Sequence, residues 1–293
     1  HKPQREFNRS KPPSIKERIQ KDINTMAQSN DDRVTSLNVL NAVAYAANIG
    51  LVMGVPSLFS LPDNAELSNK YQTIVTPAGW AFAIWGVIFT MQAIWATLQL
   101  ILPSFRTNPL VTHGVAYNYI VVCAVQVGWT FSFALEQMTM SMIWMLAILF
   151  FLFRIYQEQN KVLMEHDQES FNTNFWLQRF PFNLHLGWIV AATLVNFNVV
   201  LESYSAAAPI QFASAIVCLT IALLVGGAAL LTQKDKSRSD VTIPMVLVWA
   251  TNAISKELKD PREMILSTFS SQEIGVIKSG SMFAASALLG ATV

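Results

Sequence analysis

The sequence predicts an all-α integral membrane protein. Of its 293 residues, 52% are hydrophobic and only 13% are charged, whereas soluble domains carry roughly 25% charged residues. The apolar residues gather in eight segments, most of them close to the ~20 residues that a helix needs to cross a bilayer. These segments lie near residues 35–55, 76–102, 113–135, 138–156, 181–201, 209–232, 242–258 and 274–292.

A basic arm, residues 1–33, precedes the first segment. Ser14 and Glu17 have the spacing of a capping box, in which each side chain satisfies a backbone N–H of the other residue. Apolar residues then follow at helical spacing: Ile15, Ile19, Ile23 and Met26. We expect an amphipathic helix that lies on a membrane surface or packs against protein.

The first segment carries small residues at every fourth position, and such a stripe lets two helix backbones approach closely. They are Ala42, Ala46, Gly50 and Gly54. We expect the stripe to pack against another helix, within the monomer or across a dimer. Asn41 and Asn48 share a neighbouring face, where buried amides usually hydrogen-bond an adjacent helix. Contact with a ligand is the alternative role for these amides.

The second segment begins near Pro77, a residue favoured in the first turn of a helix because it lacks a backbone N–H. About 25 uncharged residues follow, among them Trp80 and Trp85. Trp129 and Trp188 also lie inside later segments. Aromatic side chains between helices hold flat, hydrophobic ligands. Ordinary core packing is the alternative role for these tryptophans.

The later segments carry less information about chemistry. Cys123 and Cys218 both fall inside apolar segments, where we expect them to behave as small buried hydrophobes and not as a disulfide or metal pair. The seventh segment is short, and the eighth begins with Ser, Glu and Lys. Both could be tilted or half-buried helices.

The distribution of charge predicts how the chain is oriented. Fifteen of the twenty Lys and Arg residues lie in the N-terminal arm and in the loops near 103–112, 154–180 and 233–241, which eight spans place on one side. By the positive-inside rule, we expect both termini to face the cytoplasm, the mitochondrial matrix or the plastid stroma. A cleaved targeting segment before His1 would place the protein in an organellar membrane (plastid, thylakoid or mitochondrial), although a truncated start would also explain the absence of Met. The net charge of +1 gives no reason to expect a nucleic-acid partner.

Several classes of membrane protein are disfavoured. No Asp, Glu, Lys or Arg lies in the middle of the first six segments, whereas ion-coupled transporters and membrane hydrolases need such groups. We therefore expect no enzyme activity. The titratable group within the segments is His185, which could ligate haem iron or chlorophyll magnesium. A neutral imidazole that donates to a carbonyl one turn away or on the facing helix is the alternative.

Three motifs resemble the tryptophan-rich sensory protein/translocator protein (TspO/MBR) family. Pro77-Ala78-Gly79-Trp80-Ala81-Phe82 resembles the family's Pro-Pro-Gly-Trp-x-Phe opening of its second helix. Gln126, Trp129 and Phe133 fit a third-helix pattern, and Trp188 and Asn196 keep the fifth-helix spacing. Ala78 and Ala83 replace family prolines, so the chain resembles a distant, extended member over residues 35–201.

The resemblance implies a five-helix bundle over residues 34–202. Outside it, the apolar segments predict a C-terminal extension, residues 203–293, of about three more membrane or membrane-associated helices. It places a pocket between the first, second and fifth helices, with the loop Pro56–Val75 as a lid. The pocket residues that it implies are Trp80, Phe82, Trp85, Trp129, His185, Trp188 and Asn196.

Family members bind hydrophobic planar ligands, so the resemblance implies a receptor or carrier for a sterol-like lipid or for a tetrapyrrole such as porphyrin, haem or a chlorophyll-type ring. It also implies a homodimer surrounded by membrane lipids. The alternative function is that of a structural accessory subunit in a large photosynthetic or respiratory complex, which suits the basic arm and the added C-terminal segments.

Overall fold

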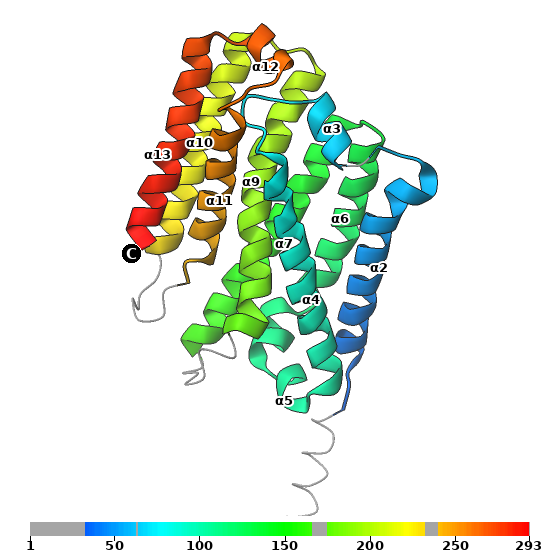
Figure 1. The fold of residues 1–293 in the computed structure, drawn as a ribbon. Helices are drawn as coiled ribbons and strands as arrows, with labels where there is room; N and C mark the ends of the chain where they lie inside the picture. The colour runs from blue at the N-terminus through cyan, green and yellow to red at the C-terminus, as the bar shows by residue number, and fades with distance from the viewer. Residues whose placement is uncertain (1–32, 63, 166–174, 232–239, 293) are drawn as a thin grey trace, which may run out of the picture.

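The eight apolar segments form eight long helices in the computed structural model, which describes residues 33–62, 64–165, 175–231 and 240–292 (Figure 1). The long helices are α2 (Ser36–Phe59), α4 (Ile84–Ile101), α6 (Asn118–Ala134), α7 (Met138–Glu165), α9 (Phe180–Ser203), α10 (Ala208–Leu231), α11 (Thr242–Glu257) and α13 (Ser271–Thr292). Short helical turns connect them: α3 (Asn64–Lys70), η1 (Gly79–Ala83), α5 (Pro103–Arg106), η2 (Leu110–Val115), η3 (Phe175–Arg179) and α12 (Glu263–Thr268). The described ranges contain no strand, so the predicted all-α class is confirmed. The predicted amphipathic helix of the N-terminal arm lies outside the described residues.

Six helices are long and apolar enough to cross a membrane. They include α13, although the eighth segment looked weak in the sequence. The helices α6 and α11, with 17 and 16 residues, are shorter. Helix α7 continues to Glu165, past the predicted end at residue 156, because the polar turns after Tyr156 keep contact with the neighbouring helices through Gln159 and Val162, both buried.

Two groups of helices share α9. On one side, α2, α4, α6, α7 and α9 form a bundle in which α4 and α7 both pack on α9. On the other side, α10, α11 and α13 pack on each other, and α10 and α11 also pack on α9 (Figure 1). The apolar window that contains α9 is accordingly 61% buried, against 39% or less for the other five candidate spans. Helix α9 is therefore the common wall of both groups.

Helix starts follow local capping chemistry. Thr35 caps α2, because the side chains of Thr35 and Asn38 each accept a hydrogen bond from the other residue's backbone N–H. Ser270 and Glu273 do the same at the start of α13. The second span begins at Gly79 and not at Pro77, which corrects the sequence-based boundary. The reason is that Ala78 is extended and donates its N–H to the carbonyl oxygen of Ala253 in α11, at 3.2 Å.

Buried amides hold α2 against its neighbours, as predicted for Asn41 and Asn48. Asn41 Nδ2 donates to Gln99 Oε1 of α4 at 3.2 Å, and Asn48 Nδ2 donates to Gln126 Oε1 of α6 at 3.1 Å. The small-residue stripe faces away from this contact. Ala46 and Gly50 are exposed, and no atom would lie within 4 Å of a Cβ placed on Gly50. The stripe therefore does not pack tightly within the monomer, and the dimer contact stays a prediction.

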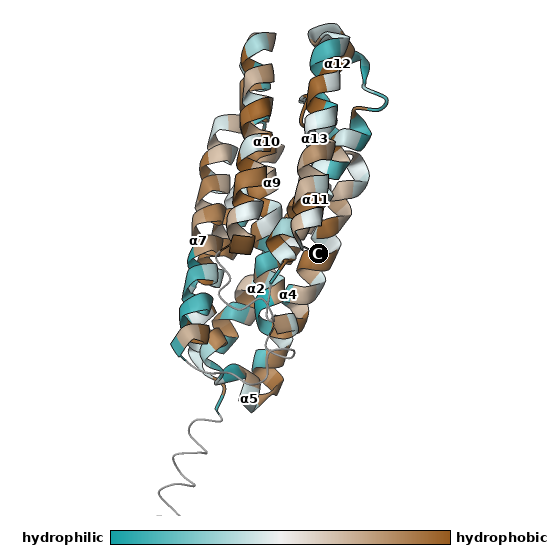
Figure 2. Ribbon diagram, turned by 90° about the vertical axis from the view of Figure 1, so that its left-hand side faces the viewer, coloured by the Kyte–Doolittle hydropathy of each residue, from teal (hydrophilic) through white to brown (hydrophobic). Residues whose placement is uncertain are grey.

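Figure 2 shows hydrophobic residues along the outer faces of the helices and hydrophilic residues gathered at the two ends, around α12 and at the far end of α7. This pattern fits a bundle surrounded by lipid, with its loops in the aqueous or headgroup region.

Candidate functional site

The connection between α2 and α4 is fastened to the C-terminal helices. Gln72 Nε2 donates to Glu257 Oε1 of α11 at 3.0 Å, and Arg262 Nη1 donates to Asn69 Oδ1 at 2.6 Å. At its other edge, Lys70 is paired with Glu136 in the turn between α6 and α7. The hydrogen bond from Lys70 lowers the pKa of the Glu136 carboxyl below its ordinary value. The predicted lid loop is thus held on both sides by polar contacts.

Beneath this connection lies an apolar cavity of about 90 Å³. Its wall is formed by the connection and by η1, α4, α6, α7, α9, α10 and α11. Five aromatic side chains contribute to it: Phe82, Trp85, Trp129, Phe133 and Trp188. The cavity therefore lies between the two groups of helices that share α9.

The aromatic rings around the cavity pack against one another. The ring of Trp188 meets those of Phe82 and Trp85 edge to face, with centroids 5.8 Å and 6.3 Å apart. Trp129 stacks on Phe133 at 5.1 Å and donates its indole N–H to Asn196 Oδ1 at 3.1 Å. Ring pairs of this kind are favourable by about 0.5–1.5 kcal/mol each beyond their buried area. The wall is consequently rigid on its α6 and α9 sides.

Trp188 carries an unsatisfied polar group at this wall. Its side chain is 2% exposed, and its Nε1 has no hydrogen-bond partner among the described residues. A buried donor without a partner costs about 1–3 kcal/mol. The Trp188 N–H is therefore available to an acceptor atom on a bound molecule.

Five of the seven sequence-predicted site residues line the cavity: Phe82, Trp85, Trp129, Trp188 and Asn196. Trp80 does not. It is 43% exposed, and its ring packs edge to face on Trp249 of α11. Trp80 precedes Phe82 by two residues, a turn of about 240° in the 3-10 helix η1, so its side chain lies on another face, toward α11.

His185 also lies outside the cavity wall, behind Trp85, whose ring centroid is 5.6 Å from the imidazole. Tyr119 donates its hydroxyl to Gln92 Oε1 at 3.1 Å, so the amide Nε2 of Gln92 faces His185 Nδ1 at 3.0 Å. Nδ1 is then the acceptor, which places the imidazole proton on Nε2. His185 is thus hydrogen-bonded to a facing helix, but it accepts from an amide instead of donating to a carbonyl as expected, and its Nε2 has no partner among the described residues.

Sequence reasoning missed the contribution of the C-terminal helices. Cys218 and Ala222 of α10 and Leu247 and Thr251 of α11 line the cavity, whereas no described residue of α2 does. The expected pocket between the first, second and fifth helices is thus displaced toward the extension. No motif marks these positions, because small and aliphatic residues line most membrane helices.

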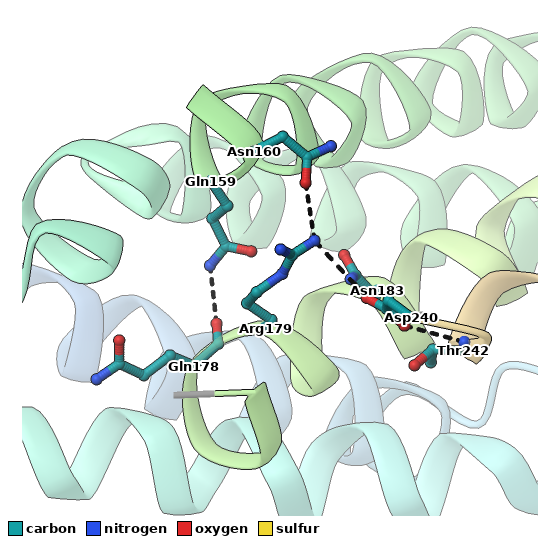
Figure 3. Close-up of polar contacts among 7 residues, drawn as sticks. All are labelled: Gln159, Asn160, Gln178, Arg179, Asn183, Asp240 and Thr242. Carbon is teal, nitrogen blue, oxygen red and sulfur yellow. Dashed lines mark hydrogen bonds and ion pairs between the residues drawn. The ribbon is translucent and has the colours of Figure 1, made fainter. Parts of the chain in front are cut away.

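A separate polar cluster joins α7, α9 and α11 (Figure 3). It lies at the opposite end of the bundle from the connection between α2 and α4 (Figure 1). Arg179 lies 3.7 Å from Asp240 and donates to Asn160 Oδ1 at 2.8 Å. Asn183 also donates to the Asp240 carboxylate, whose other oxygen accepts the N–H of Thr242 at 3.0 Å. These contacts fix the start of α11 to the rest of the bundle. In the described ranges no cluster of His, Cys, Asp or Glu could hold a metal ion.

Comparison with known families agrees with the fold. A family model described as TSPO-like protein matches residues 35–282. The match passes residue 201, where the sequence resemblance was expected to end, and includes α10, α11 and part of α13. No curated protein and no solved structure matches the chain. The chain is a multi-pass membrane protein, in which six of the helices that the structure describes could span the bilayer, and it belongs to the family of TSPO-like proteins.

Proposed function

We propose that the protein is a non-catalytic receptor or carrier for a hydrophobic planar ligand, a tetrapyrrole or a sterol-like lipid, in an organellar membrane. The observation that carries this proposal is the unpaired indole N–H of Trp188 at a wall of aromatic and aliphatic side chains. Such a wall favours a flat apolar body, and the donor favours one acceptor atom on it, such as a carboxylate, ketone or hydroxyl oxygen.

The cavity is smaller than a typical ligand pocket. Ligand pockets usually enclose about 300–1,000 Å³, whereas this cavity encloses about 90 Å³. Binding of a tetrapyrrole or sterol therefore requires the walls to separate. The connection between α2 and α4 is the part we expect to move, because polar contacts hold it at both edges, and the contact between Lys70 and Glu136 is exposed to water.

Quenching of tryptophan fluorescence by protoporphyrin tests the proposal. We expect saturable quenching by the wild-type protein and about tenfold weaker binding by Trp188→Phe, which keeps a ring but removes the N–H. Trp176→Phe is the matched control, since Trp176 is 53% exposed on η3, away from the cavity. Non-saturable quenching, or equal affinity of both variants, would contradict ligand binding at this site.

The alternative, a structural subunit of a larger membrane complex, is favoured by one observation. The stripe with Ala46 and Gly50 faces outward on α2 without tight packing in the monomer, and small residues on a lipid-facing helix are typical of helix–helix interfaces. Native gels of solubilised membranes distinguish a ligand receptor from a subunit of a larger complex. A free dimer supports the receptor, and migration with a large complex supports the subunit.

A further inference from the structure

A long apolar groove runs along the outside of the bundle between α7, α9 and α10. Its volume is about 800 Å³, far larger than the aromatic cavity, and α9 separates the two. One side of the groove is formed by residues of α7 that are each about half exposed: Leu146, Phe150 and Phe153. The groove therefore opens toward lipid. The opposite side is formed by Ile221 and Ala228 of α10.

The groove has the length of one membrane leaflet. On α7 it runs from Leu146 to Asn160, which at about 1.5 Å per residue is about 21 Å. Half of a bilayer that measures about 40–45 Å with its headgroups has the same extent. A molecule that lies in this groove therefore reaches from the centre of the membrane to its headgroup region.

Only one end of the groove is polar. Tyr156, Gln157 and Asn160 lie there, at the end nearer the cluster of Figure 3. Arg179 donates to Asn160 Oδ1 at 2.8 Å, and Figure 3 shows the amide nitrogen of Asn160 pointing away from Arg179. The amide nitrogen of Asn160, which lines the groove, is therefore not used in the contact with Arg179.

The charges beside this polar end favour an anion. Arg154 and Lys161 lie one helical turn before and after Gln157 on α7, and both side chains are exposed. Glu158 lies between them, 4.0 Å from Arg154 and 3.1 Å from Lys161. Two cations and one carboxylate leave the rim with a net positive charge. Basic sites beside membrane helices bind the headgroups of anionic lipids.

We propose that this groove binds one glycerophospholipid with an anionic headgroup. One of its two acyl chains lies along the apolar side of the groove from Leu146 to Phe153, and its phosphate lies at Gln157 and Asn160, close to Arg154 and Lys161. The groove and the aromatic cavity share Leu194 of α9, whereas the other α9 residues of the groove, Leu186, Val190 and Thr193, do not line the cavity.

Native mass spectrometry of the purified full chain, titrated with phosphatidylglycerol or phosphatidylcholine, tests the proposal. We expect one retained phosphatidylglycerol per chain. Ala228→Phe fills the groove and lowers retention of both lipids at least tenfold, while Leu224→Phe, on the same helix and 65% exposed outside the groove, retains both. Circular dichroism and size-exclusion elution confirm that each variant is folded.

A second set of variants tests how much the basic side chains contribute to lipid binding. Arg154→Gln/Lys161→Gln lowers retention of phosphatidylglycerol about fivefold per charge and leaves phosphatidylcholine unchanged, whereas Lys256→Gln/Lys259→Gln, at the other end of the bundle, has no effect. Equal retention by Ala228→Phe and Leu224→Phe would overturn the proposal. Displacement of phosphatidylglycerol by equimolar cholesterol would also overturn it, in favour of a sterol site.

Discussion

The indole rings of Trp80 and Trp249 meet edge to face, with their centroids 4.6 Å apart and their planes at 90°. Trp80 belongs to the opening of the second span, and Trp249 belongs to α11 of the C-terminal extension. Trp249 Nε1 also donates to the carbonyl oxygen of Ala81 at 3.1 Å. The entry to the second span, which forms part of the cavity wall, is therefore built jointly with the extension.

Replacement of Trp249 by Ala removes both this ring contact and this hydrogen bond. We expect a loss of about 1–3 kcal/mol in the free energy of unfolding, since each interaction is worth about 0.5–1.5 kcal/mol. Unfolding in mixed detergent micelles measures the loss. Trp176→Ala is the control, because Trp176 is 53% exposed on η3 and its ring contacts are with Phe175 and Phe180. An equal loss in both variants would contradict the contribution of Trp249 to the start of the second span.

Close approach of α9 and α11 depends on Gly187. A Cβ at this position would lie 2.9 Å from Val246 Cβ and 3.3 Å from Ile243 Cα, so Gly187→Ala forces the two helices apart. We expect destabilisation of about 1–3 kcal/mol. Gly227→Ala on α10, which meets no atom within 4 Å, should be neutral or stabilising by up to about 1 kcal/mol. Thermal unfolding of the Gly187→Ala and Gly227→Ala variants tests this prediction. Equal melting temperatures would contradict a close contact between α9 and α11 at Gly187.

The buried chain from Tyr119 through Gln92 to His185 predicts a graded response to mutation. Gln92→Leu removes both hydrogen bonds of the chain, whereas Tyr119→Phe removes only the bond to Gln92 Oε1. At about 1–3 kcal/mol for each unpaired group, Gln92→Leu should cost about twice as much stability as Tyr119→Phe. Chemical denaturation of both variants tests this order, and the reverse order would rule out the chain as described.

Acid should weaken the contact between Lys70 and Glu136. Because the pKa of Glu136 is lowered from 4.5 in the folded protein, its stabilising effect is complete at higher pH and is lost as the pH falls below that value. The difference in melting temperature between wild type and Glu136→Gln should therefore be constant from pH 7 to about 5.5 and shrink toward pH 3. Lys70→Gln should show a similarly reduced acid dependence, and a wild-type profile in either variant would contradict the prediction.

Much of the fold was predictable because lipid imposes a strong constraint. A backbone in hydrocarbon must satisfy its own hydrogen bonds, so each long apolar segment has to be helical. All eight segments are helices in the structure. The buried bonds of Asn41 and Asn48 were predictable for a similar reason, since an amide at membrane depth needs a partner on a neighbouring helix. The start of the second span was not, because it depends on the bond between Ala78 and Ala253, which are far apart in the sequence.

The sequence by itself determined the class of the protein, its membrane helices and five of the residues that line the cavity. Only the tertiary structure decided that Trp80 faces Trp249 instead of the cavity, that His185 lies behind Trp85, and that α10 and α11 replace α2 in the wall. The physical reason is that hydropathy fixes which segments become helices. The rotation and neighbours of each helix are fixed by side-chain packing and hydrogen bonds between residues distant in the chain.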